Sequence, residues 1–312
     1  DRSVSRGLGD VYKRQLRARN RPRQTFMTNS TYVPKPRELL PDWMVGLTDR
    51  VMNYYTKRYL NCEPVILKNP PLPQEGHQYM LYAHVPFCHT LCTYCTFHRF
   101  LFKEWKAREY FQNLRKEMEY VKALGYDFTA MYVGGGTTTI LEDELVKTLE
   151  LAKKLFPSIK EISCETDPQV IMTPQFRNLQ GLVDRMSIGV QSFNDEILKL
   201  SDRYEKFGSG EQIYERLQYA QELFPTCNVD MMFGFRGQSL DVLHEDMEKI
   251  VKLNPRQVTT YPLMVTSQTR ASARAKIAAT GLELADQYRV IMDSLAVSYT
   301  HLRAHETLSD LV

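Results

Sequence analysis

The sequence predicts an α/β fold in which six strands alternate with helices between residues 77 and 266. Two observations support this fold class. From Tyr79 onward, short apolar runs alternate with amphipathic stretches, which is the pattern of repeated βα units. In addition, each polar or glycine-rich motif follows an apolar run, at the strand ends where parallel folds carry their sites. The expected strands are residues 79–85, 130–133, 161–165, 185–190, 228–232 and 257–263.

Helix signals lie between the expected strands. Apolar residues at steps of three and four mark residues 106–124, and Gly125 provides a C-terminal stop. A similar stripe over residues 145–156 follows an acidic first turn. Thr173, followed by a proline, has the form of an N-cap with proline at the first helical position, and Ser239 has the form of a second N-cap.

Composition narrows the class of protein. The net charge of +3 predicts no dedicated surface for nucleic acid. No apolar run approaches the roughly 20 residues that a membrane span requires. The six cysteines, without a secretory signal, favour a reducing cytoplasmic location.

The most informative motif is Cys88-x-x-x-Cys92-x-x-Cys95, directly after the first expected strand. Three thiolates on one short loop can bind three irons of a 4Fe–4S cluster. The loop offers no fourth cysteine, so one iron keeps a position for a ligand that is not protein. That arrangement is typical of chemistry at the cluster rather than of simple electron transfer.

The cysteines are open to two other interpretations. A structural zinc site needs four ligands, and either His89 or His98 can complete the set, although no second ligand pair follows. A disulfide framework is disfavoured because the chain is long enough to build a sizeable core. The cluster interpretation is preferred to both.

The cysteine loop resembles the cluster-binding loop of the radical SAM superfamily. The motifs at the ends of the later expected strands also resemble motifs of that superfamily. Residues 81–88 resemble its branch of oxygen-independent coproporphyrinogen III oxidases and related haem-handling proteins, and the resemblance covers roughly residues 79–265. It implies a partial (β/α)6 TIM-like barrel with a truncated C-terminal domain. It also implies a 4Fe–4S cluster and S-adenosylmethionine as cofactors.

The resemblance assigns residues to S-adenosylmethionine. Gly134-Gly-Gly-Thr-Thr-Thr139 is similar to the family's GGGTPT motif, which binds the methionine amino group, with Thr138 in place of the usual proline. The nucleoside contacts would come from strand-end residues, and two tyrosines flank the cysteines. The implied cofactor-binding residues are Tyr82, Tyr94, Gly135, Gly136, Thr137, Glu165, Gln191, Arg203, Asp230 and, through its backbone, Met264.

The resemblance implies reductive cleavage of S-adenosylmethionine to a radical that abstracts hydrogen from a substrate. No catalytic residue is assigned. Phe97 stands where authentic coproporphyrinogen oxidases carry a further cysteine. An enzyme acting on a tetrapyrrole, a haem chaperone of the same family, and a radical enzyme with an unrelated substrate therefore all remain open. An electron donor such as flavodoxin or ferredoxin is also implied.

Both ends of the chain are expected to be foreign to the fold. Residues 5–15 read codon for codon as a transposase-based sequencing adapter, and residues 297–307 read as its reverse complement. We therefore interpret residues 1–15 and 297–312 as adapter-derived, with Met27 as a possible natural start. The remaining expected regions are an N-terminal arm and linker (16–76), the barrel (77–266) and the start of a truncated C-terminal region (267–296).

Overall fold

The computed structural model describes residues 42–60, 70–264 and 281–298. Most of the predicted adapter segments, Met27 and part of the predicted C-terminal region lie outside the described residues. The chain divides into two compact units, residues 1–69 and 70–312. In the first unit, the described element is helix α2 (Asp42–Tyr59).

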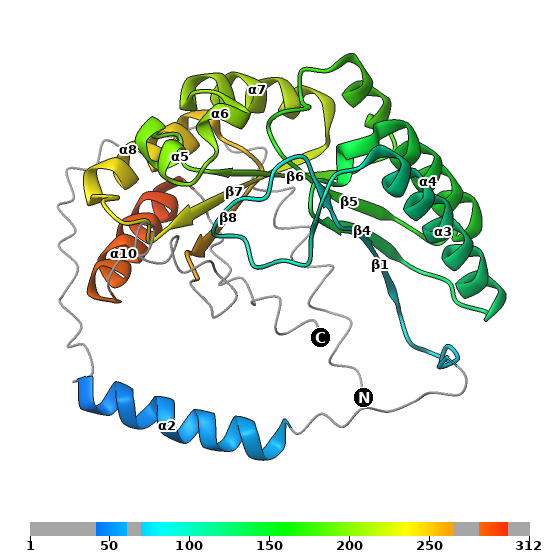
Figure 1. The fold of residues 1–312 in the computed structure, drawn as a ribbon, viewed down its shortest axis with the longest axis horizontal. Helices are drawn as coiled ribbons and strands as arrows, with labels where there is room; N and C mark the ends of the chain where they lie inside the picture. Colours follow the sequence, from blue (N-terminus) through cyan, green and yellow to red (C-terminus); the bar gives the residue numbers. More distant parts are fainter. Residues whose placement is uncertain (1–41, 61–69, 265–280, 299–312) are drawn as a thin grey trace. The chain divides into compact units, whose positions relative to one another are not determined.

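The second unit is built on a six-stranded sheet in the order β1-β4-β5-β6-β7-β8, with every neighbouring pair parallel (Figure 1). All six predicted strands are confirmed, with ends that shift by up to two residues. The α/β fold class is confirmed as well. The strands are β1 (Met80–Val85), β4 (Ala130–Gly135), β5 (Glu161–Thr166), β6 (Arg185–Gln191), β7 (Thr226–Phe233) and β8 (Gln257–Pro262).

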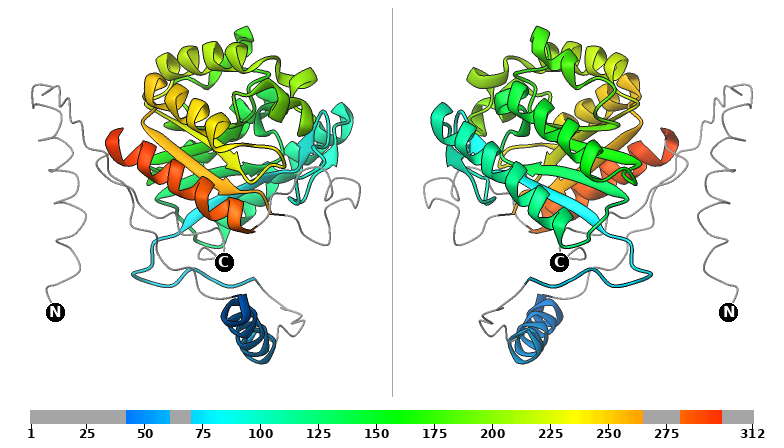
Figure 2. Two further views of the ribbon diagram at one scale, coloured as in Figure 1. Left: turned by 90° about the vertical axis from the view of Figure 1, so that its left-hand side faces the viewer. Right: turned by 90° about the vertical axis from the view of Figure 1, so that its right-hand side faces the viewer.

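Helices cover the outer side of this sheet (Figures 1 and 2). Their apolar stripes and the inward-facing strand residues form one buried core, in which side chains such as Phe111, Leu149 and Ile188 are fully enclosed. The helices are α3 (Glu104–Ala123), α4 (Glu142–Leu155), α5 (Asp195–Leu200), α6 (Tyr204–Phe207), α7 (Gly210–Leu223), α8 (Leu240–Leu253) and α10 (Gly281–Ser298), with short 3-10 turns η1 (Thr138–Leu141) and η2 (Pro174–Leu179).

The predicted helix signals have mixed outcomes. Ser239 accepts a hydrogen bond from the backbone N–H of Val242 and so caps α8 as expected. Thr173 is an N-cap with Pro174 at the start of the helical segment, as expected, although that segment is only the short 3-10 turn η2. Its hydroxyl makes no capping hydrogen bond, because it donates to the carbonyl of Val170 and to Glu142 instead of accepting from a backbone N–H of the turn.

Helix α10 belongs to the helical layer of the second unit. Its Ile291 and Leu295 are buried in the main core, and the side-chain amide of Gln287 donates to the carbonyl of Gln238 at 2.6 Å. The helix extends to Ser298, two residues into the segment predicted to be adapter-derived.

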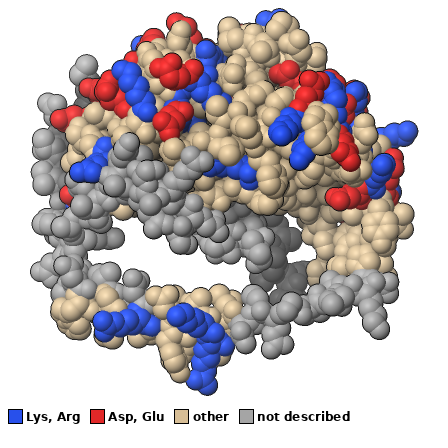
Figure 3. Space-filling view, viewed as in Figure 1, with Lys and Arg blue, Asp and Glu red and all other residues tan. Residues whose placement is uncertain are grey.

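On the face of the second unit drawn in Figure 3, neither sign of charge dominates, because lysines and arginines are mixed with acidic residues over the helices. This mixture agrees with the small net charge. Within the described ranges, no helix combines the length and apolar character needed to cross a membrane.

Candidate metal and cofactor site

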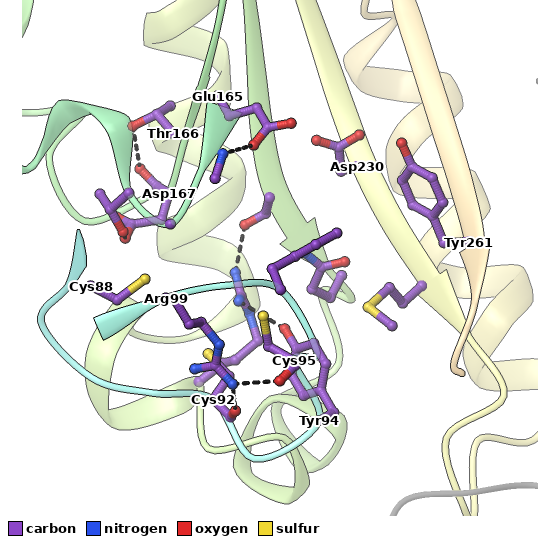
Figure 4. A pocket seen from close by; sticks show the side chains of 18 of the residues that line it. Cys88, Cys92, Tyr94, Cys95, Arg99, Glu165, Thr166, Asp167, Asp230 and Tyr261 are labelled. Carbon is purple, nitrogen blue, oxygen red and sulfur yellow. Dashed lines mark hydrogen bonds between the residues drawn. The ribbon is translucent and has the colours of Figure 1, made fainter. Parts of the chain in front are cut away.

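One cavity, with a volume of about 260 Å³, is lined by the cysteine loop and by the carboxyl ends of the strands (Figure 4). Of the thirteen residues predicted to bind cluster or cofactor, twelve line it, and Tyr82 is the exception. The twelve are Cys88, Cys92, Tyr94, Cys95, Gly135, Gly136, Thr137, Glu165, Gln191, Arg203, Asp230 and Met264. Residues that are up to 176 positions apart in sequence therefore face one space.

Tyr82 lies beside the cavity rather than in its lining. Its ring stacks on Tyr132, which does line the cavity, and its hydroxyl is 2.9 Å from Nδ1 of His84. The side chain is 51% exposed.

The cysteine loop begins and ends in a two-residue parallel pairing of β2 (Phe87–Cys88) with β3 (Phe100–Leu101). Between them, the guanidinium of Arg99 donates through Nη2 to the carbonyl oxygens of Cys92 and Cys95, each at 2.6 Å. The loop is thus closed at its ends by backbone pairing and in its middle by one side chain.

The three thiols fit a cluster better than the two alternatives. All three are free, which excludes a disulfide between described cysteines. Within the described ranges, no group of three or more His, Cys, Asp or Glu side chains is close enough to hold a single metal ion. A 4Fe–4S cube binds each thiolate to a different iron, so its ligands need not converge on one point. Neither His89 nor His98 lines the cavity, and this disfavours the zinc site.

Burial raises the pKa of both the Cys88 and the Cys95 thiols. Opposing influences come from the Thr137 hydroxyl and then the Lys206 charge at Cys88, and from the Arg99 guanidinium at Cys95. The surroundings therefore combine a desolvated pocket with nearby cations, which suits thiolates once iron binds them.

The glycine run packs directly against the cysteine loop. A Cβ atom added at Gly136 would lie 2.5 Å from the carbonyl oxygen of Phe87 and 2.9 Å from Sγ of Cys88. Backbone N–H groups of Gly136 and Thr137 donate to the carbonyls of Val85 and Phe87, both at 2.8 Å. Glycine is required here because the two loops approach so closely.

These hydrogen bonds engage the backbone N–H groups of Gly136 and Thr137 within the protein. The backbone N–H of Gly135 donates to the Glu165 carboxylate at 3.1 Å. The N–H groups of Gly135, Gly136 and Thr137 are therefore all used within the protein. The amino group of a ligand is itself a donor, so it would need acceptors here rather than N–H groups. Carbonyl and side-chain oxygens are the groups with which this edge can meet an ammonium.

Glu165 is held at the end of β5 by the Gly135 amide on one oxygen and by the Tyr132 hydroxyl, at 2.6 Å, on the other. The Thr138 hydroxyl also donates to its backbone carbonyl. The carboxylate is consequently fixed in direction before any ligand arrives.

Three buried polar atoms of cavity-lining residues have no hydrogen-bond partner. They are Nε of Arg99, Oε1 of Gln191, a residue with a positive φ of 77°, and Nε of Arg203. The rest of the Arg203 guanidinium is engaged: Nη1 donates to the Tyr94 hydroxyl at 3.0 Å, Nη2 donates to the carbonyl of Gly189 at 2.5 Å, and the group lies over Phe207. An unpaired acceptor beside an unpaired donor is the arrangement expected where a polar ligand binds.

Asp230 lies deeper in the sheet, on β7. Its oxygens accept from the Ser187 hydroxyl and the Asn228 amide, both at 2.8 Å. Burial nevertheless raises the pKa of this carboxyl to about 7. Met264, by contrast, is 67% exposed at the rim.

Sequence reasoning missed several residues of the lining. Asp167 accepts from the Thr137 hydroxyl at 2.9 Å and pairs with Lys206 at 3.2 Å, and both side chains are nearly buried. Arg99 is a third lining residue that was not predicted from the sequence. Asp167 stands within a motif that was noticed, whereas nothing in the local sequence distinguishes Lys206 or Arg99 from surface cations. Tyr132 and Tyr261 also line the cavity.

Comparison with known proteins agrees with this geometry. The family model described as "Radical SAM superfamily" matches residues 82–250. The heme chaperone HemW of Bacillus subtilis is 30% identical over 196 residues, covering 60% of this chain and 51% of the relative. The oxygen-independent coproporphyrinogen III oxidase of Salmonella typhimurium is 29% identical over 228 residues, covering 70% of this chain and 49% of the relative.

Among solved structures, coproporphyrinogen III oxidase (HemN) from Escherichia coli superimposes with a TM-score of 0.63 at 25% identity. The match covers 71% of this chain and 53% of that one. This likeness confirms the expected barrel-type fold. The chain spans about half the length of the relatives that it matches.

Proposed function

Because the chain belongs to the radical SAM superfamily, we propose that it holds a 4Fe–4S cluster on Cys88, Cys92 and Cys95 and cleaves S-adenosylmethionine reductively. The substrate that we propose is a tetrapyrrole. When bound, these cofactors supply a one-electron cleavage of a carbon–sulfur bond, and the protein supplies binding, orientation and exclusion of water.

The observation that carries this proposal is that the three thiols line the same cavity as Gln191 and Arg203, each of which has a buried polar atom without a hydrogen-bond partner. The first group can bind irons, and the second can bind a polar organic ligand. S-adenosylmethionine is a ligand that needs both at once. A cluster with a purely structural role would leave these buried polar atoms without hydrogen-bond partners.

We assign the following tasks to the residues of the cavity. The oxygens at the edge of β4 and the Thr137 hydroxyl would accept hydrogen bonds from the amino group of the ligand. Gln191 and Arg203 direct its ribose, with Arg203 oriented by Tyr94. Asp230 offers a carboxyl that burial keeps partly protonated near neutrality, so it can donate as well as accept at a hydroxyl.

The electron donor would approach the cluster from the outer side of the loop. Cys92 lines both the cavity and a shallow hollow on the surface, together with His89, Thr90 and Leu91. A flavodoxin or ferredoxin docked there would face a cluster ligand directly. The free thiols of the described cysteines favour a reducing compartment, and we propose the cytoplasm.

A second candidate function, a haem chaperone without turnover, is favoured by Phe97. This side chain is 63% exposed and lines the cavity at the position where coproporphyrinogen oxidases are expected to carry a further cysteine. The similarity to HemW and to the oxidases is equal, at 30% and 29% identity, and does not separate the two.

Release of 5′-deoxyadenosine tests the proposal. The chain, reconstituted with iron and sulfide without oxygen, is incubated with S-adenosylmethionine and dithionite, with and without coproporphyrinogen III or haem. Release that a tetrapyrrole stimulates supports the enzyme. Tight haem binding with no stimulated release supports the chaperone. A cluster-loaded protein that neither binds haem nor responds to a tetrapyrrole overturns the choice of substrate.

A further inference from the structure

Arg99 occupies an unusual position in the cysteine loop. A single nitrogen, Nη2, lies 2.6 Å from the carbonyl oxygens of both Cys92 and Cys95. The backbone supplies one weaker link of its own, from the N–H of Cys95 to the carbonyl of Cys92 at 3.4 Å. The guanidinium thus ties together the backbones of two of the three expected cluster ligands (Figure 4).

The charge of Arg99 is also left uncompensated. Within the described part of the chain it forms no ion pair, and its buried Nε has no hydrogen-bond partner. Lys206, the other cation near the thiols, is paired with Asp167 at 3.2 Å. Arg99 lines the same cavity as the thiols, so its field acts on whatever negative charge they carry.

Building on the function proposed above, we propose that Arg99 is a positioning residue that fixes the cysteine loop and raises the reduction potential of the cluster. A cluster on three thiolates gains one negative charge when it is reduced. An uncompensated cation nearby stabilises the reduced form more than the oxidised form. Charges and hydrogen bonds around cluster ligands are known to tune potentials in this way.

Two substitutions separate the geometric role from the charge. Arg99→Lys keeps the charge, but its nitrogen lies one bond nearer the backbone than Nη2 and lacks the fixed N–H directions of the guanidinium, so the two hydrogen bonds to the carbonyls should be lost or weakened. Arg99→Met loses both. We expect Arg99→Met to lower the equilibrium constant for one-electron reduction about tenfold, equal to ~59 mV. We expect Arg99→Lys to keep most of the potential but to release iron to a chelator several-fold faster than the unsubstituted chain.

The experiment uses anaerobically reconstituted protein and does not depend on turnover. Iron and sulfide are assayed chemically, the potential is measured by redox titration followed by EPR, and iron release is timed against a chelator. Arg289→Met is the matched control, because this arginine is on α10, pairs with Asp286 and does not line the cavity. It should leave all three quantities unchanged.

The outcomes are distinct. If the unsubstituted chain takes up no cluster, the proposed function fails. If it does, and Arg99→Met has the potential and iron-release rate of the unsubstituted chain, the inference about Arg99 is overturned. Should Arg99→Met fail to fold, as judged by circular dichroism, Arg99→Lys decides: unchanged iron release overturns the positioning role, and a tenfold loss in the reduction constant overturns the role of charge.

Discussion

The two sides of the cavity are held in different ways. On the sheet side, Glu165, Gln191 and Asp230 stand on strands that pair with a neighbour on both edges, with one register shift between Gly189 and Gln191. On the loop side, the segment between Phe87 and Leu101 has one two-residue strand pairing and otherwise single contacts, among them those of Arg99 and the hydrogen bond from Arg203 to Tyr94. Substitutions on the loop side should therefore change cluster binding with little effect on the fold, and those on the sheet side should change stability or cofactor affinity.

The largest effect is expected for a cluster ligand. Cys88→Ser should abolish stoichiometric iron and sulfide in the reconstituted protein, because two cysteines remain for the cube. Cys227→Ala is the control: this thiol is buried in the core, away from the cavity, and its loss should cost on the order of 1 kcal/mol of stability without changing iron content. Normal iron in Cys88→Ser would contradict the ligand assignment.

Gly136→Ala should be nearly as damaging, although it adds only a methyl group. The methyl would collide with the Phe87 carbonyl and crowd Cys88 Sγ, so the cysteine loop must move. We expect iron content to fall several-fold while circular dichroism stays native. Gly181→Ala provides the contrast, because it has open space and a φ of +79°: it should cost about 1 kcal/mol of stability and keep the cluster. Equal iron in both variants would show that the close approach is unimportant.

A smaller effect is expected on the sheet side at Gln191. Gln191→Leu removes the unpaired buried acceptor, and we expect S-adenosylmethionine to bind about tenfold more weakly, a loss of ~1.4 kcal/mol. Iron content should be normal. Calorimetry on the loaded protein measures the affinity, with the exposed Gln218→Leu as a control. Unchanged affinity would remove Gln191 from the cofactor site.

The most gradual effect is a pH dependence from Asp230. Its pKa is raised to about 7 in the folded protein, against 3.8 for the free group. Between these values the folded state binds more protons than the unfolded state, so stability falls as pH rises, by at most about 1.4 kcal/mol per pH unit. Chemical denaturation between pH 4 and 7 should show this slope, and Asp230→Asn should flatten it. Parallel slopes in both proteins would contradict the buried, protonated carboxyl.

The sheet side and the loop side of the cavity also differ in how well they can be predicted from the sequence. The strands were predictable because apolar runs between helical stripes specify a buried parallel sheet, and the residues at their ends follow from that register. Arg99 was not, since its partners are backbone carbonyls whose positions depend on the folded loop. The β2–β3 pairing is too short to leave a periodic signal, and α10 joins the helical layer from a region expected to begin another domain.

The most direct measurement of the central claim is the EPR spectrum of the dithionite-reduced, reconstituted chain, recorded with and without S-adenosylmethionine. If three thiolates hold the cube and its fourth iron faces the cavity, adding the ligand should change the g-values of the cluster signal, and Cys88→Ser should give no such signal. A stoichiometric cluster whose spectrum is identical with and without S-adenosylmethionine would contradict it.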